Sequence, residues 1–179
     1  SGPPRPDLHP PAPCSPGHEV EDDEACEALL DLTRPWAEQS NGRAAAIVVE
    51  GAAEAAVAAL CPAGALVSEV DGAWALAVMT WAAASGGAYG RRRGTAVGRA
   101  AAWWAVARLA ALDWPAPGAA LGEAGAAVRG LAGEAPDCTL GWGLHLAGEI
   151  PGEGLAFAIG ASDARREEAG AGGLSPIRG

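Results

Sequence analysis

The side chains that stand out for their chemistry lie between positions 85 and 99, where short runs of glycine and arginine alternate. Glycine-rich backbone that leads into a helix offers free N–H groups and the positive end of the helix dipole, both of which favour an anion. Arginine adds a forked set of donors that matches a carboxylate or a phosphate. The segment therefore predicts a binding site for a phosphate, a carboxylate or an acidic protein segment, formed by Arg91, Arg92, Arg93, Thr95 and Arg99.

The charges around this segment separate it from the rest of the chain. No acidic residue occurs in the 41 positions from Gly72 to Leu112, whereas five of the 12 arginines lie between Arg91 and Arg108. The whole chain has no lysine and a formal net charge of -10. We expect a positive island on an acidic body. The overall charge argues against a general nucleic-acid binder, whose domain is normally basic.

Two arrangements of the segment are compatible with its spacing. On a continuous helix, Arg92 and Arg99 share one face with Thr95 between them, because they are seven residues apart. If the helix instead begins at Thr95, Arg91 to Arg93 lie in the preceding loop and fold back over the helix N-terminus. Both arrangements place guanidinium groups around one anion-sized space.

Structural roles for the same residues stay open. Gly90, Gly94 and Gly98 are four apart, so on a helix they form a smooth stripe for close helix packing, with the arginines as a solvated rim. Glycines inside a helix cost about 1 kcal/mol each, which favours a loop for at least the first of them. The arginines also have internal partners on offer in the acidic first helix, at positions 21–24 and at Asp31. The glycine spacing matches neither the P-loop, which needs a lysine, nor the dinucleotide-binding fingerprint.

An alternative function depends on a histidine. His145 is the only titratable group on one face of a predicted hairpin, a face otherwise made of glycine and alanine. It is a candidate general base if that face lines a cleft, although a lone histidine is more often structural. The alternative hypothesis is a small enzyme acting on a phosphorylated or carboxylated metabolite, with the arginines as a clamp and His145 as acid/base. That hypothesis requires His145 to share a pocket with the arginines.

The remaining metal-capable and aromatic residues favour structural interpretations. Cys14, His18 and Cys26 match no zinc-binding spacing, so we predict no metal and no cofactor. Cys61 and Cys138 are interpreted as small buried hydrophobic residues. The seven tryptophans, against one tyrosine and one phenylalanine, are expected to give bulk to a core otherwise built of alanine and valine.

Periodicity and breaker residues predict the elements that position these side chains. Acidic residues at 21–24, ahead of apolar positions, predict a first helix, and the Ile-Val-Val run within 44–49 predicts a strand. Further helices are expected at 52–60, at 72–85 with Asp71 as its cap, at 95–112 and at 119–129. The helix at 95–112 is apolar nearly all round, which is typical of a central position. Together with 72–85 it forms a pair of long central helices.

The last third of the chain changes to period two. Large and small residues alternate at 140–147 and at 155–160, on either side of a turn at 151–154, which predicts a β-hairpin. One face is expected to enter the core. The small-residue face lets a helix, a ligand or another chain approach the backbone, including a second copy in a homo-oligomer. Helices, an early strand and a late hairpin predict an α+β domain with a small antiparallel sheet.

Composition also predicts the limits of that domain. Seven of the first 16 residues are proline, so residues 1–18 are expected to form a disordered tail. A single domain is expected over 20–163, followed by a flexible stretch at 164–179 that is poor in large apolar residues. The uncharged run from Gly72 to Gly90 looks like a membrane span. Glycines at 86 and 87, however, limit its helix to about 14 residues, which is too short.

The same composition bears on origin and function. Alanine supplies 45 residues and glycine 26, and lysine is absent, which indicates a high-GC bacterial genome. The chain shows no signal-peptide pattern, so we expect a cytoplasmic protein without membrane attachment. We hypothesise a non-catalytic binding or assembly module that holds an anionic small molecule or an acidic protein segment at the glycine/arginine segment.

Overall fold

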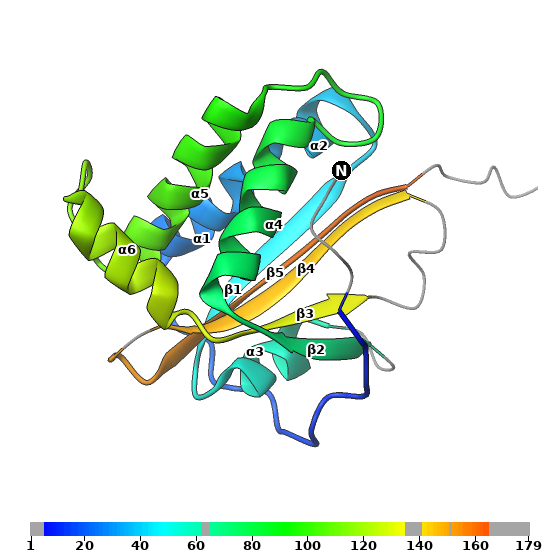
Figure 1. Cartoon of the computed structure of the whole chain (residues 1–179). Helices are drawn as coiled ribbons and strands as arrows, with labels where there is room; N and C mark the ends of the chain where they lie inside the picture. Colours follow the sequence, from blue (N-terminus) through cyan, green and yellow to red (C-terminus); the bar gives the residue numbers. More distant parts are fainter. Residues whose placement is uncertain (1–5, 62–64, 135–140, 151, 165–179) are drawn as a thin grey trace, which may run out of the picture.

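A five-stranded antiparallel sheet with strand order β1-β5-β4-β3-β2 forms the centre of the structure (Figure 1). The computed structural model describes residues 6–61, 65–134, 141–150 and 152–164. The strands are β1 (Arg43–Glu50), β2 (Leu66–Val70), β3 (Gly130–Glu134), β4 (Gly141–Ile150) and β5 (Leu155–Ala164). The C-terminal hairpin β4–β5 therefore lies inside the sheet, with β1 beside β5 and β3 beside β4.

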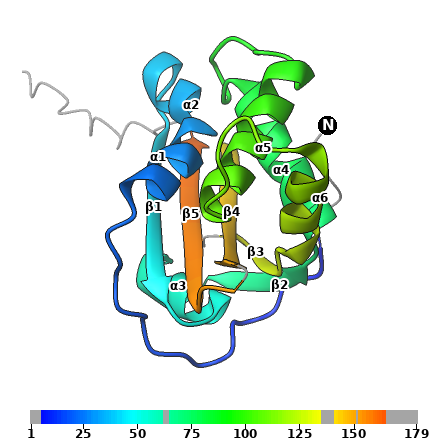
Figure 2. The ribbon, with the colours of Figure 1, turned by 90° about the vertical axis from the view of Figure 1, so that its left-hand side faces the viewer.

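The helices of the described residues cover both faces of this sheet. They are α1 (Asp23–Asp31), α2 (Arg34–Gln39), α3 (Ala53–Leu60), α4 (Gly72–Ser85), α5 (Thr95–Leu109) and α6 (Gly118–Ala127). Only α3 lies on one face; α1, α2, α4 and α5 lie on the other, where α6 packs against α4 and α5 (Figures 1 and 2). The predicted α+β fold, with two long central helices and a C-terminal hairpin, is confirmed.

Short polar side chains begin two of the helices. Asp22 caps α1 by accepting the N–H of Ala25 at 3.0 Å, and Asp71 caps α4 by accepting the N–H of Trp74 at 2.8 Å. An N-cap carboxylate satisfies an N–H group that the helix itself leaves unpaired. Gly86 ends α4 in the left-handed conformation, at φ +73°. The cap that the sequence predicts at Asp71 is therefore present.

The two faces of the hairpin differ as their alternation predicts. Leu146 pairs with Ile159, and both side chains are buried in the main core beneath the helical layer. On the other face Ala147 pairs with Ala158, and both belong to a second buried cluster under α3. Because these side chains are only methyl groups, α3 lies close to the backbone of the hairpin. Of the three neighbours that the sequence allows for the small-residue face, a helix is the one found over these two alanines.

Two strands have no counterpart among the sequence-based expectations. Strand β2 is five residues long, and its adjacent residues Val67 and Ser68 are both buried, so it shows no period-two pattern. Strand β3 reads Gly-Leu-Ala-Gly-Glu, which carries little β-propensity. Both strands are held by pairing with their neighbours in the sheet rather than by a local signal. The helix expected at 95–112 ends at Leu109.

The first described residues form an extended segment, the N-terminal strap (residues 6–20), which overlaps the stretch 1–18 that is predicted to be a disordered tail. His9 bridges Val67 on the outer edge of β2, with main-chain hydrogen bonds of 2.8 and 2.7 Å. Glu19 bridges Val49 on the outer edge of β1. Between the two bridges the strap passes outside α3 (Figure 2). Proline cannot donate a hydrogen bond, but the residues between the prolines of the strap supply the N–H groups.

The predicted flexible stretch at 164–179 falls outside the described residues, apart from Ala164 at the end of β5. Within the described part of the chain, every helix is too short or too polar to cross a membrane.

Candidate functional site

The predicted arginine segment forms the connection between α4 and α5, here called the arginine loop (residues 86–94). Gly86 ends α4, and Gly94, at φ +88°, precedes the first residue of α5, Thr95. The segment thus takes the second of the two predicted arrangements, in which the three consecutive arginines lie before the helix. These arginines together with Arg99, here called the basic cluster (Arg91, Arg92, Arg93 and Arg99), are exposed, as is Thr95.

A buried carboxylate lies beneath this loop. Asp163 of β5 is fully buried and accepts the main-chain N–H of Ala88 at 2.6 Å. Its other oxygen accepts the hydroxyl of Ser40, which follows α2, at 2.9 Å. A Cβ atom on Gly87, where φ is +81°, would overlap a carboxylate oxygen of Asp163 and lie 3.2 Å from the ring of Trp36. Only glycine therefore lets the loop approach the sheet this closely.

A tryptophan supports the start of the loop. Trp36 of α2 is buried, and its Nε1–H donates to the carbonyl of Ala82 at 3.2 Å and to Oγ of Ser85 at 3.1 Å. Its ring meets Trp81 and Trp142 edge to face, at centroid distances of 5.8 and 6.5 Å. Trp81 and Trp142 stack on each other at 5.2 Å, so each ring covers the facing surface of the other.

Two more hydrogen bonds fix the main chain of the arginines themselves. The N–H of Arg91 donates to Oε1 of Gln39 in α2 at 3.1 Å, and the N–H of Arg93 donates to the carbonyl of Ala84 in α4 at 2.9 Å. The loop lies beside α2 in Figure 1, as these contacts require. The backbone is therefore anchored from both sides, while the guanidinium groups extend into solvent.

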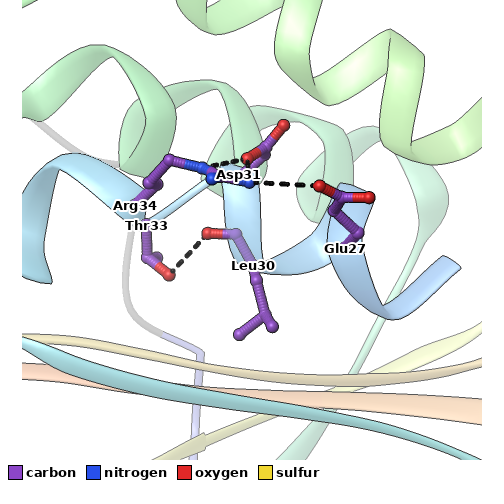
Figure 3. A network of polar contacts seen from close by, with 5 residues as sticks. All are labelled: Glu27, Leu30, Asp31, Thr33 and Arg34. Atoms are coloured by element: carbon purple, nitrogen blue, oxygen red, sulfur yellow. Dashed lines mark hydrogen bonds and ion pairs between the residues drawn. The ribbon is translucent and has the colours of Figure 1, made fainter. Parts of the chain in front are cut away.

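Three acidic residues of α1 bind other arginines. Asp31 and Glu27 both pair with Arg34, the second of them at 3.6 Å (Figure 3). The carboxylate of Asp31 accepts a hydrogen bond from Arg34 and raises the pKa of that guanidinium. Glu24 pairs with Arg108 at 2.6 Å, near the far end of α5. Within the described part of the chain, no carboxylate forms an ion pair with the basic cluster.

The three regularly spaced glycines have three different environments. A Cβ atom on Gly98 would overlap the carbonyl oxygen of Thr80, so Gly98 lies where α4 and α5 touch. A Cβ on Gly90 would instead overlap the carbonyl oxygen of Gly86 within the loop itself. Gly94 faces open space. The glycines therefore form no continuous packing stripe, and only Gly98 serves helix packing.

His145 lies on the opposite face of the sheet from the arginine loop. It pairs with Gly160, and a Cβ atom on that glycine would lie 3.5 Å from the imidazole and 3.7 Å from Leu60 of α3. Asp163, on the same strand as Gly160, faces α2 and the loop. The structure thus places three arginines of the basic cluster in the loop and Arg99 in α5, with His145 apart from them, across the sheet.

A cavity that the sequence analysis did not anticipate lies at the other end of α4. It has a volume of about 490 Å³, and its charged lining consists of Glu54, Glu69, Asp71, Arg129 and Glu149. Glu54 belongs to α3, Glu69 to β2 and Glu149 to β4, while Asp71 directly precedes α4 and Arg129 directly precedes β3. No local pattern in the sequence links residues from so many elements. Asp71 caps the start of α4, and the arginine loop follows the end of the same helix. Because α4 has 14 residues, its two ends are about 20 Å apart.

The comparisons with known proteins identify a family. Residues 3–142 match the model of a family of unknown function, DUF6183. Neither the search of curated proteins nor the search of solved structures gave a match. The matched residues include the arginine loop, all six described helices and strands β1 to β3, and they stop at the second residue of β4. Since the match spans well over half of its length, the chain belongs to the DUF6183 family.

Proposed function

We propose that this protein is a non-catalytic binding or assembly module that holds an anionic ligand or an acidic protein segment at the arginine loop. The observation that carries the proposal is the basic cluster itself. Its four guanidinium groups are exposed and form no ion pair with a described residue, although their backbone is anchored. An anchored backbone lowers the conformational entropy that the loop loses on binding.

Electrostatics favours an anion at this loop. The four arginines lie within nine positions, and no carboxylate occurs between Asp71 and Asp113 to offset them. Gly94, directly before α5, has no side chain to cap the first N–H groups of that helix. Free N–H groups and the helix dipole add to the attraction for negative charge.

Two exposed apolar side chains flank the basic cluster. Tyr89 is 60% exposed and Val97 is 39% exposed. Arginine and tyrosine are both enriched in protein interfaces. These neighbours favour an acidic protein segment that also carries apolar side chains.

The geometry favours binding over the catalytic alternative. An enzyme that clamps its substrate with the arginines and uses His145 as acid/base needs both at one pocket. The sheet separates them, because His145 lies on the α3 face and Asp163 holds the loop on the other.

The experiment measures binding of a fluorescent octaglutamate peptide and of pyrophosphate at low and high salt. We expect Arg92→Gln/Arg99→Gln to weaken binding by about tenfold or more, since each charge-assisted hydrogen bond contributes about 1.5–3 kcal/mol. The matched control is Arg43→Gln/Arg129→Gln, which removes the same charge from exposed arginines on other elements. Equal losses in both variants, or no binding by the parent at low salt, would overturn the proposal. Unfolding of the first variant would show that the arginines serve stability.

A further inference from the structure

We infer that Asp163 is the positioning residue of the anion site: its buried carboxylate holds the arginine loop in the conformation that binds. This inference rests on the proposed function, because it concerns how that same site is formed. Asp163 itself touches no ligand, since it lies beneath the loop and is fully buried.

The burial of Asp163 requires an explanation. A carboxylate is almost never fully buried unless it is paired or hydrogen-bonded, because it loses its hydration. The two hydrogen bonds of this carboxylate go to the N–H of Ala88 and to the hydroxyl of Ser40. One partner belongs to the arginine loop and the other follows α2. The carboxylate therefore ties the loop to the sheet and to α2 at once.

The hydrogen bond between Asp163 and Ala88 acts on the arginines through a short length of main chain. Ala88 lies three positions before Arg91, whose own N–H is held by Gln39, the neighbour of Ser40. The N–H of Arg93 is held by Ala84 at the end of α4. The stretch 88–93 is thus held at three points. Asp163 provides the only one of the three that comes from the sheet.

The absence of a side chain at Gly87 is what allows this contact. A Cβ atom there would overlap the carboxylate oxygen that accepts the N–H of Ala88. Gly87→Ala is therefore a second way to separate Asp163 from the loop, without changing the carboxylate or the arginines.

The test compares Asp163→Ala, which removes both hydrogen bonds, with Asp163→Asn. An asparagine oxygen can still accept the N–H of Ala88, and its amide can donate to Oγ of Ser40. With octaglutamate as the probe, we expect Asp163→Ala to raise the dissociation rate constant about tenfold. We expect Asp163→Asn to stay within about threefold of the parent. Association rate constants and their salt dependence should be the same in the two variants, because each removes the one negative charge of Asp163 and leaves the charges of the basic cluster intact.

A stability control separates positioning from general loosening. Val49→Ala destabilises the cluster under α3, far from the loop, and should leave the dissociation rate constant unchanged at a temperature where every variant is folded. If Asp163→Ala does not fold, Ser40→Ala removes one of the two bonds and should raise the rate constant by a smaller factor.

The outcomes distinguish this inference from the proposed function. If the parent does not bind octaglutamate, the proposed function and the positioning role of Asp163 are both overturned. If the parent binds and Arg92→Gln/Arg99→Gln does not, but neither Asp163→Ala nor Ser40→Ala changes the dissociation rate constant, the binding function stands and the role of Asp163 is overturned. A change of the same size in Val49→Ala also overturns it.

Discussion

Gly98 of α5 lies so close to Thr80 of α4 that a Cβ atom on the glycine would overlap the carbonyl oxygen of the threonine. The same atom would lie 2.8 Å from Cβ of Ala84. The two longest helices therefore touch backbone to backbone at this point. Because the arginine loop joins these helices, their contact sets the distance between the two ends of the loop.

Gly98→Ala should accordingly separate α4 from α5. We expect a loss of about 1–3 kcal/mol in the free energy of unfolding, as for other insertions into close-packed contacts. The matched control is Gly122→Ala, inside α6, where a new Cβ meets no atom within 4 Å. That change should instead stabilise by about 0.5–1 kcal/mol, because alanine favours a helix. Urea unfolding measures both, and the same sign in both variants would contradict the packing role.

The N-terminal strap offers a test based on a single N–H group. His9→Pro removes the donor to the carbonyl of Val67, which should lower the free energy of unfolding by about 1 kcal/mol. His9→Ala keeps the main-chain bond and removes only an exposed side chain, so its midpoint in urea should equal that of the parent. Equal midpoints for the two variants would mean that the strap contributes nothing at β2.

Trp36→Phe keeps an aromatic ring beside Trp81 and Trp142 but removes the indole N–H. Two acceptors, the carbonyl of Ala82 and Oγ of Ser85, then lose this donor. We expect thermal unfolding to show a loss of about 1–3 kcal/mol. Trp114→Phe serves as the control, because Trp114 is 45% exposed and the change should stay within about 0.5 kcal/mol. A larger effect at Trp114 would rule out this account.

Alkaline pH should destabilise the fold through two thiols. Burial raises the pKa of both Cys26 and Cys61, and the nearby carboxylate of Asp22 raises that of Cys26 further. A thiol whose pKa is higher in the folded state makes its full contribution to stability below the unfolded pKa of about 8.5. That contribution is lost as the pH rises through the folded pKa. Urea midpoints should therefore fall above about pH 8.5, and less steeply in Cys26→Ala/Cys61→Ala.

The control for this pH dependence is Cys14→Ala, because Cys14 is exposed. Its stability should fall with pH as steeply as that of the parent. An unchanged slope in Cys26→Ala/Cys61→Ala would assign the alkaline loss to other groups.

Local signals in the sequence account for the elements that were predicted. The period-two alternation of β4 and β5, the cap at Asp71 and the glycines that end α4 all act over a few residues. The basic cluster is visible for the same reason, since three of its members are consecutive and the fourth follows six positions later. Local patterns in the sequence are therefore sufficient to predict the position of the arginines and of most of the helices.

Contacts between distant residues account for what the sequence analysis missed. Asp163 and Ala88 are 75 positions apart, and no residue near either of them in the sequence indicates that they form a hydrogen bond. Strand β2 is held by pairing with β3, and β3 is held by pairing with both β2 and β4. The strap bridges the two edge strands at residues far from it in sequence, and its own composition gives no signal of these bridges. Each of these features depends on the assembled sheet.

The order of the strands has a consequence for protein synthesis. Because β5 and β4 separate β1 from β3, a nascent chain that has left the ribosome only as far as residue 134 holds β1 with no partner strand. The apolar undersides of α4 and α5 then lack the hairpin residues that cover them in the finished domain, such as Phe157 and Ile159. The domain therefore cannot close its core until this hairpin emerges, and the apolar undersides of α4 and α5 stay uncovered up to that point.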